Sequence, residues 1–159
     1  MRAYFLISAL LFFIVAVFSC KSDDEITILD SQQASNQALD MISGQVIETE
    51  LDSSGIAPAW EVTVLTDTGS EVEFYFTQDG GALIQIEGDD GPFNYDLDPG
   101  LGLISFSSAK QAALDEYEGD IVKWELEQDP QGKWVYEFVI AANGNEKTIK
   151  IDAQSGAAI

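Results

Sequence analysis

The fold is decided by two patterned segments and the turn that joins them: Trp134-Val135-Tyr136-Glu137-Phe138-Val139-Ile140, Asn143-Gly144 and Lys147-Thr148-Ile149-Lys150-Ile151-Asp152. In the first segment every second side chain is aromatic or Ile, which gives a strand one apolar face. An Asn-Gly pair between two such segments is a strong hairpin signal, because both residues accept the positive φ angles of a type I′ turn. We therefore predict two antiparallel strands over residues 134–152.

The unit that contains this hairpin occurs twice in the chain. A shift of 75 positions places residues of the first half on residues of the same type in the second half. The aligned pairs include Ala34 with Ala109, Ala38 with Ala113, Leu39 with Leu114, Asp40 with Asp115, Gly44 with Gly119, Glu50 with Glu125 and Leu51 with Leu126. Matches of this density at a single offset indicate an internal repeat.

Each copy is predicted to begin with a helix and to continue with antiparallel strands. Asp30, with Gln33 three residues later, has the form of a capping box, and Ser105 is a weaker N-cap for the second helix. Gly44 and Gly119 are predicted to end the two helices as C-cap glycines. The fold class is α+β: two repeats of one helix followed by an antiparallel sheet of three to four strands, with the helices on one sheet face. Whether the two copies share one continuous sheet stays open.

Alternation along the strands assigns side chains to an inward and an outward face. The predicted inward residues are Ile47, Thr49, Leu51, Trp60, Phe74 and Phe76 in the first copy, and Val122, Trp124, Leu126 and Trp134 in the second. Short closing strands are expected at residues 82–86 and 157–159. Core packing is the first interpretation of the three tryptophans, and a ligand platform is the second.

The domain organisation follows from these patterns. We expect a lipoprotein signal peptide at residues 1–19, an acidic tether at 20–27, the first repeat at 28–87, a connector at 88–102 and the second repeat at 103–159. The connector is rich in Gly, Pro and Asp, as turns are. Phe93, Tyr95 and Leu97 alternate inside it, which favours a short strand over a free linker.

The first residues have the layout of a secretory signal, with Arg2, an apolar run over residues 3–18 and a small residue before Cys20. A single-span anchor is the alternative, but the run is shorter than the roughly 20 residues of a membrane span. The sequence Val-Phe-Ser-Cys resembles a bacterial lipobox, which implies that Cys20 carries lipid and anchors the chain. The acidic residues that follow resemble export signals of surface lipoproteins. We therefore expect an outer-membrane anchor facing the cell surface, with the periplasmic face as the alternative.

Composition argues against several classes of function. The chain has 28 acidic and 7 basic residues and a net charge of −21, which opposes binding to nucleic acid because phosphates are repelled. It has no histidine, and its only cysteine, Cys20, is expected to carry lipid, so the commonest general base is missing and a free thiol nucleophile is not expected. The sequence contains no phosphate-binding loop or dinucleotide fingerprint. We predict a non-enzymatic protein without a cofactor, and a hydrolase that uses paired carboxylates ranks lowest.

The outward strand positions gather acidic residues around one tyrosine. The predicted partner-binding residues are Tyr75, Glu61, Glu71, Glu73, Glu125 and Glu137. This face is a candidate docking surface for a basic protein or peptide, although carboxylates also keep an open sheet from aggregating. The alternative function is a calcium-binding module, and it would use the acidic connector residues Asp89, Asp90, Asp96 and Asp98. Their spacing fits no EF-hand loop.

The second copy resembles a PepSY domain, a small helix-plus-sheet module of metalloprotease propeptides and of many bacterial envelope proteins. The matching pieces are Ile104-Ser105, Ala109, Ala113, Gly119, the strands at 121–126 and 134–138, Asn143-Gly144 and Asp152-Ala153-Gln154-Ser155-Gly156. The first copy follows the same plan, but Thr77-Gln78-Asp79-Gly80-Gly81 lacks the leading acid of the final turn. Tandem pairs of this kind are similar to the PepSY-like β-lactamase-inhibitor group. The resemblance implies protein binding or modulation of a peptidase, and it transfers no catalytic residue.

Overall fold

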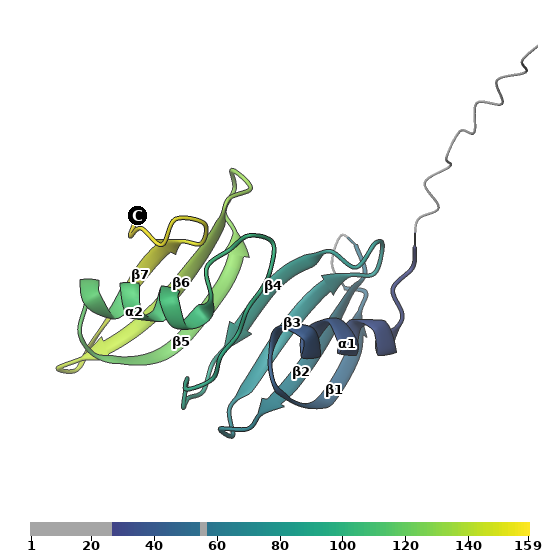
Figure 1. Cartoon of the computed structure of the whole chain (residues 1–159), viewed down its shortest axis with the longest axis horizontal. Coiled ribbons are helices and arrows are strands. Elements are labelled where there is room, and N and C mark those ends of the chain that lie inside the picture. The colour runs from purple at the N-terminus through teal and green to yellow at the C-terminus, as the bar shows by residue number, and fades with distance from the viewer. Residues whose placement is uncertain (1–26, 55–56) are drawn as a thin grey trace, which may run out of the picture.

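The computed structural model describes residues 27–54 and 57–159, and it contains one seven-stranded antiparallel sheet with two helices on the same face (Figure 1). The strands lie side by side in the order in which they follow one another along the chain. The elements are α1 (Ser31–Met41), β1 (Gly44–Asp52), β2 (Ala59–Thr66), β3 (Glu71–Thr77), β4 (Leu83–Gly88), α2 (Phe106–Glu116), β5 (Asp120–Gln128), β6 (Trp134–Ala142) and β7 (Asn145–Asp152). The predicted fold class, including the repetition of helix and strands, is confirmed.

The two repeats form a single continuous sheet, which settles the question that the sequence left open. β4, the last strand of the first repeat, pairs antiparallel with β5, the first strand of the second. The paired residues are Gln85 with Glu127, Ile86 with Leu126, Glu87 with Glu125 and Gly88 with Trp124. β4 continues beyond its predicted end at residue 86, whereas residues 157–159 make only an isolated bridge between Ala158 and Ile151.

Both helices begin where their caps predict. The Asp30 carboxylate accepts a hydrogen bond from the Gln33 amide (2.8 Å), and the Gln33 side chain accepts one from the Asp30 amide (2.9 Å). This reciprocal pair satisfies amide groups that the first turn of a helix leaves without partners. The Ser105 hydroxyl accepts a longer bond from the Ser108 amide (3.3 Å). Among the described residues no helix is long and apolar enough to span a membrane.

The two repeated glycines do not cap the helices, so that prediction was wrong. α1 ends at Met41 and α2 at Glu116, and each C-cap residue is extended. Gly44 is the first residue of β1, and Gly119 directly precedes β5. A Cβ atom on Gly44 would lie 2.5 Å from a backbone oxygen of β2, and one on Gly119 would lie 2.5 Å from a backbone oxygen of β6. Glycine is required here for close approach of two strands rather than for a left-handed cap.

A β-bulge corrects the predicted alternation at the same place in both repeats. The register shifts between Val46 and Glu48 in β1, and between Ile121 and Lys123 in β5. Ile47 and Val122 are therefore 47% and 37% exposed, and the inward places that the sequence assigned to them are taken by Val46 and Ile121. A bulge inserts one unpaired residue into a strand and reverses the faces of the residues before it. Periodicity alone does not mark that position.

The repeats share a hydrogen-bond frame that ties each helix start to its sheet. The indole of Trp60 in β2 donates to the Leu29 carbonyl (2.8 Å), and the hydroxyl of Tyr136 in β6 donates to the Ile104 carbonyl (2.9 Å). These two acceptors each lie one residue before a helix N-cap. Their own amides also make equivalent bonds, to the carbonyls of residues 78 and 153, both at 2.8 Å. The structural counterpart of Trp60 is thus Tyr136.

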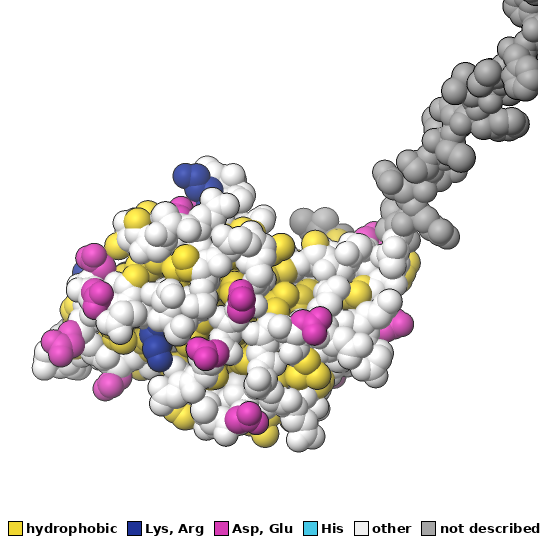
Figure 2. Space-filling model, viewed as in Figure 1, with side chains coloured by type: hydrophobic (Ala, Val, Ile, Leu, Met, Phe, Trp, Pro, Cys, Tyr) yellow, Lys and Arg dark blue, Asp and Glu magenta, His cyan; other side chains and the backbone are white. Residues whose placement is uncertain are grey.

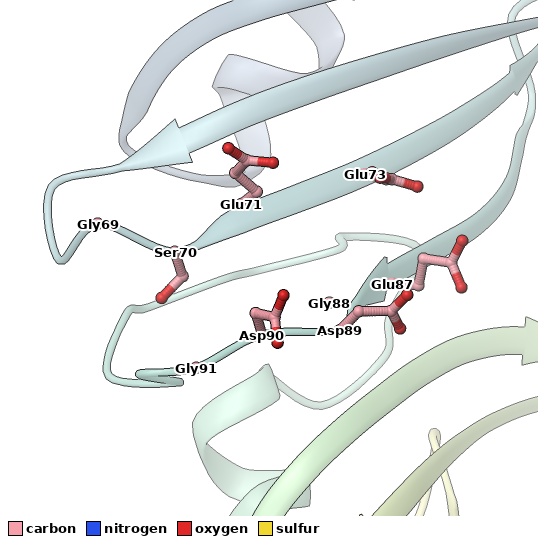
Figure 3. Close-up of a pocket in the computed structure, with 9 residues that line it drawn as sticks. All are labelled: Gly69, Ser70, Glu71, Glu73, Glu87, Gly88, Asp89, Asp90 and Gly91. Atoms are coloured by element: carbon pink, nitrogen blue, oxygen red, sulfur yellow. The ribbon is translucent and has the colours of Figure 1, made fainter.

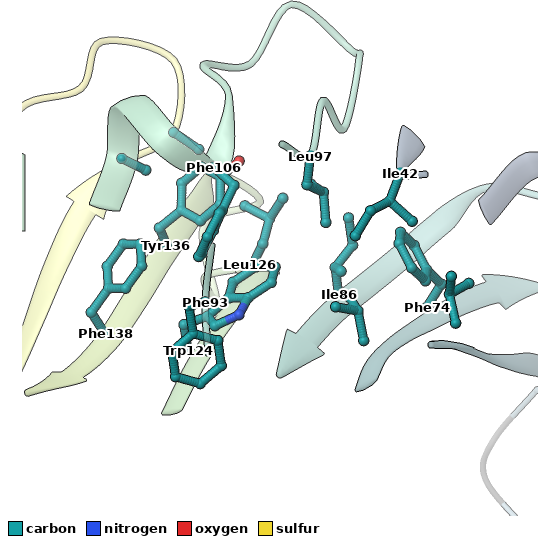
Figure 4. Close-up of a cluster of buried hydrophobic side chains, with 14 of the residues drawn as sticks. Ile42, Phe74, Ile86, Phe93, Leu97, Phe106, Trp124, Leu126, Tyr136 and Phe138 are labelled. Carbon is teal, nitrogen blue, oxygen red and sulfur yellow. The ribbon is translucent and has the colours of Figure 1, made fainter. Parts of the chain in front are cut away.

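The connector closes the core between the repeats instead of forming a strand. Figure 4 shows Leu97 between the aromatic cluster of the second repeat and the Ile42, Phe74 and Ile86 side chains of the first. Leu97 makes a single β-bridge with Ile42, and the Tyr95 hydroxyl accepts a hydrogen bond from the Trp124 indole (2.8 Å). The tryptophan prediction is confirmed: one indole is fully buried, and the other two are half-buried against the core. The outward positions of both repeats therefore lie on one continuous sheet.

Candidate functional site

The candidate site is the sheet face opposite the helices, which we call the acidic face. The strand register aligns one row of residues across all seven strands, in the order Glu48, Thr63, Glu73, Glu87, Glu125, Glu137 and Lys150. The neighbouring row is Glu50, Glu61, Tyr75, Gln85, Glu127, Val135 and Asp152. In the first row four successive strands present glutamates directly opposite one another. Each like-charged cross-strand pair costs about 0.2–1 kcal/mol of stability.

Tyr75 lies at the centre of this face and points outward, as predicted. Its hydroxyl is within hydrogen-bonding distance of Glu73 Oε2 (2.7 Å) and Glu87 Oε1 (3.1 Å), one carboxylate on its own strand and one on the next. Burial, followed by the hydrogen bond to Glu73, raises the pKa of Tyr75 above its ordinary value. The phenol therefore remains a donor at neutral pH and holds two carboxylates in place.

Lys123 neutralises the middle of the acidic face. Its ammonium contacts Glu125 (2.9 Å), Asp89 (3.0 Å) and Glu87 (3.4 Å). The hydrogen bond to Glu125 is the main cause that raises the pKa of Lys123. Burial nevertheless raises the pKa of the Glu87 carboxyl, because its contacts with Tyr75 and Lys123 offset the desolvation only in part.

Charge is distributed unequally between the two repeats. Residues 28–87 contain 11 Asp and Glu residues and no Lys or Arg, whereas residues 103–159 contain ten acidic residues and five lysines. In the second repeat Lys150 forms an ion pair with Glu137. The counterpart of Glu137 in the first repeat is Glu61, which has no cation beside it within the described ranges. Burial, followed by the charge of Glu73, raises the pKa of Glu61. The unneutralised part of the face is the first repeat.

A hollow of about 360 Å³ opens at one end of this face, between the start of β3 and the end of β4. Figure 3 shows carboxylates on both sides of it: Glu71, Glu73, Glu87, Asp89 and Asp90. One wall is held to the connector because the Ser70 hydroxyl donates to the Pro92 carbonyl. Tyr75 and Lys123 donate to Glu73, Glu87 and Asp89, and the further acceptor positions of these carboxylates suit an ammonium or guanidinium group.

The helix-bearing side of the molecule differs from the acidic face. Figure 2 shows acidic side chains spread singly over that side, among polar and apolar ones. Carboxylates are therefore not gathered everywhere simply because the chain is acidic. The register of the sheet concentrates them on one face.

The structure brings the six predicted partner-binding residues onto this face, with Glu71 at its edge in the hollow. Their role in binding stays a prediction. Sequence reasoning missed Glu87, which touches both Tyr75 and Lys123, because the closing strand was expected to end one residue earlier. Its alternation with Gln85 was the available signal. Cys20, with the predicted signal peptide, lies outside the described residues.

The connector carboxylates do not converge, so the calcium hypothesis finds no support here. Asp89 and Asp90 line the hollow on the acidic face, whereas Asp96 and Asp98 line a different hollow beside the end of α1. Asp98 also accepts a hydrogen bond from the Gly100 amide (2.9 Å). Within residues 27–54 and 57–159 no group of three or more Asp, Glu, His or Cys side chains is placed to hold a metal ion.

Comparison with known protein families shows the family of this chain. No curated protein matches the sequence. A presumed lipoprotein of Clostridium difficile 630, known from a crystal structure, is 18% identical and aligns over 85% of this chain and 93% of its own, with a TM-score of 0.39. The family described as "Peptidase propeptide and YPEB domain", or PepSY, matches residues 28–87 and 103–159. These two matches cover most of the chain, which therefore belongs to the PepSY family.

Proposed function

We propose that this protein is a non-enzymatic lipoprotein of the bacterial envelope that binds a basic segment of a protein through its acidic face. The observation that carries the proposal is the diagonal row Glu50, Glu61 and Glu73 across β1, β2 and β3, whose like charges act on one another in a repeat that contains no Lys or Arg. Such a row opposes folding, and a partner that brings Lys or Arg side chains relieves the repulsion on binding.

The position of Tyr75 supports binding rather than mere solubility. A solvated acidic coat needs no fixed geometry, whereas the Tyr75 hydroxyl and the Lys123 ammonium hold Glu73, Glu87 and Glu125 in defined orientations. Fixed acceptors lose less conformational entropy when a ligand binds. The face is therefore preorganised for a partner with complementary donors.

The family suggests the kind of partner. The matching domain is named for peptidase propeptides, and propeptides act by contact with a peptidase. We propose that the partner is a peptidase or a protein that a peptidase processes, and that binding modulates the processing. A catalytic role for this chain is not proposed, because no nucleophile or general base can be nominated on the acidic face.

The N-terminal sequence supplies the proposed anchor. Lipid on Cys20 would hold the mature chain at the outer membrane, with residues 21–27 as tether and the acidic face free to meet a partner at the cell surface. A Cys20→Ser variant tests this: it should not incorporate the labelled fatty acid that the wild type incorporates, and globomycin should lead to accumulation of the unprocessed wild type. Equal incorporation of labelled fatty acid by both chains, or none by the wild type, would contradict the anchor.

The binding proposal is tested by charge reversal. A chain with Glu61→Lys and Glu73→Lys is compared with wild type and with the matched control Glu116→Lys and Glu118→Lys, which places the same charge on exposed helix-side residues. Proteins cross-linked to each chain in intact envelopes are identified and then purified for titration. We expect the same basic partner with wild type and control, and a loss of affinity of about tenfold or more with the reversed face. Equal affinity for all three chains would contradict the proposal.

A further inference from the structure

We infer that the open edge of β1 accepts an extended partner segment as an eighth strand, antiparallel to β1, with the pattern basic–apolar–basic. The inference rests on the proposed function, since it names the part of the acidic face to which the partner binds. The evidence is a comparison of the two repeats: among the described strands the outer edge of the first strand is unpaired in the first repeat and paired in the second.

β1 and β5 are the equivalent strands of the two repeats. β5 has a neighbour on both sides, β6 on one and β4 on the other. β1 pairs with β2 on one side, and within the described residues no strand pairs with its other side. Figure 1 shows β1 as the outermost strand of the first repeat. An unpaired edge presents free backbone N–H and C=O groups and is a template for an added strand.

β4 shows what a strand at this edge does for the core. Ile86 of β4 lies opposite Leu126 of β5, and both side chains are fully buried. The counterpart of Leu126 is Leu51 of β1, which occupies an inward position yet is 39% exposed. The exposed surface of Leu51 is therefore the place that an apolar side chain of an added strand would cover, as Ile86 covers Leu126.

The outward positions set the charge of the occupant. In the second repeat Gln85 and Glu87 of β4 lie opposite Glu127 and Glu125. The counterparts of those two glutamates on β1 are Asp52 and Glu50, both exposed. Across β1 the next strand adds Glu61 opposite Glu50, and residues 28–87 contain no Lys or Arg. Basic side chains on either side of the apolar one would meet these carboxylates.

A second copy of the chain is a poorer occupant. The first repeat carries a net charge of −11 by the count above, so two β1 edges repel each other. The other edge of the sheet, β7, is partly covered by the residues that follow it: the Asp152 amide donates to Ala157 O (2.8 Å) and the Ile159 amide to Lys150 O (3.0 Å). Within residues 27–54 and 57–159, β1 is the more open of the two edges, and a basic partner fits it.

The test uses the peptide acetyl-Thr-Thr-Lys-Ile-Lys-Thr-Thr-amide and the chain from Lys21 onward, which contains every described helix, strand and core residue. Two further peptides carry N-methyl groups on alternate residues, one in each register. Only one register directs its amides toward β1 in an antiparallel ladder. We expect the peptide whose β1-facing amides are methylated to bind about tenfold more weakly than the parent peptide, or weaker still. The peptide methylated in the other register should keep an affinity near that of the parent. Amide hydrogen exchange of residues 49–52 should slow when the parent peptide binds.

Protein variants complete the test. Glu50→Lys with Asp52→Lys should abolish measurable binding, whereas the control Glu116→Lys with Glu118→Lys should not change it; thermal melts verify that both fold. Equal binding of both N-methylated peptides, combined with loss in Glu61→Lys and Glu73→Lys, would overturn edge addition and leave docking on the face intact. Absence of binding by the parent peptide would also overturn the inference, as would a dimer in sedimentation that Glu50→Lys disrupts.

Discussion

The two repeats share a backbone frame and differ in what they expose. In both, an aromatic side chain donates to the carbonyl before the helix N-cap, a glycine allows two strands to approach, and a bulge follows in the first strand. In the second repeat, by contrast, lysines neutralise the outward glutamates and β4 covers the edge of the first strand. The first repeat has no lysine of its own, and among the described strands none pairs with the outer edge of β1. The shared hydrogen bonds, glycines and bulges stabilise the fold of each repeat, whereas the differences lie on the surface that we propose for binding.

The helices differ as well. Phe106, the first residue of α2, is fully buried among Tyr95, Trp124 and Phe138, with ring centroids 4.4–5.9 Å apart. The equivalent residue of α1 is the exposed Ser31. The second repeat therefore holds the larger aromatic cluster, whereas the first repeat buries the pair Phe74 and Phe76.

The largest expected effect separates the repeats at this position. Phe106→Ala should lower the free energy of unfolding by about 3–5 kcal/mol, because it leaves a cavity in the aromatic cluster. Ser31→Ala should change it by less than about 0.5 kcal/mol. Urea denaturation followed by tryptophan fluorescence and by circular dichroism measures both. Because β4 and β5 join the repeats, the two probes should report one transition, and separate transitions would show that the repeats unfold independently.

The next effect should be equal in the two repeats. Gly44→Ala and Gly119→Ala each place a Cβ atom 2.5 Å from a backbone oxygen of the adjacent strand. Each should cost about 1–3 kcal/mol, since the neighbouring backbone has to shift. Ser43→Ala, next to Gly44 and exposed, serves as control. If the glycines capped the helices instead, as the sequence suggested, the loss would be smaller and would appear as lower helicity.

A smaller effect distinguishes the neutralised and unneutralised halves of the acidic face. Burial and neighbouring carboxylates raise the pKa of Glu61 above 4.5. An acid whose pKa is raised by folding destabilises the protein progressively as the pH rises through the interval between the two pKa values. Glu61→Gln should therefore stabilise the chain at pH 7 by about 0.2–1 kcal/mol. Glu137→Gln, its counterpart, should not stabilise, because it breaks the ion pair with Lys150. Thermal melts from pH 4 to 8 test this, and equal gains from both variants would contradict the difference.

The smallest effect concerns the turns that close the repeats. Hydrogen bonds from the Ser155 hydroxyl and amide lower the pKa of Asp152 below 3.8, whereas the same position in the first repeat is Thr77, which does not titrate in this range. The contribution of Asp152 is present above pH 3.8 and is lost as the pH falls through the lowered value. Asp152→Asn should reduce the acid sensitivity of stability slightly, and Thr77→Val should not alter it. Melts between pH 2 and 5 measure both; a steeper acid dependence in Asp152→Asn would contradict the assignment.

Much of the fold could be predicted because it is written in local patterns. Asp30 and Gln33 predicted the start of one helix, and Asn143-Gly144 predicted a hairpin. The alternation around Phe74 placed Tyr75 on the outer face. The errors have physical causes. Ile47 and Val122 lie at bulges, where one extra residue reverses the alternation. Gly44 is required by the close approach of β2 rather than by the end of α1.

The site was predicted in composition but not in arrangement. Glu61, Glu73, Glu125 and Glu137 were recognised as outward, yet their alignment depends on how β4 pairs with β5, about 40 residues apart along the chain at Glu87 and Glu125. No periodicity within a strand specifies that pairing. Glu87, at the centre of the row, was missed because the closing strand was expected to end at residue 86, whereas β4 continues to Gly88.

The sequence by itself determined the repeat, the helix starts, the apolar and acidic faces of the strands and the N-terminal pattern that predicts an anchor, because each depends on residues close together in the chain. Only the tertiary structure decided that the repeats form one sheet, that four glutamates meet in a row, and that β4 pairs with β5 while no described strand pairs with the outer edge of β1. Those features arise from hydrogen bonds between distant strands, whose partners are selected by the packing of the whole core.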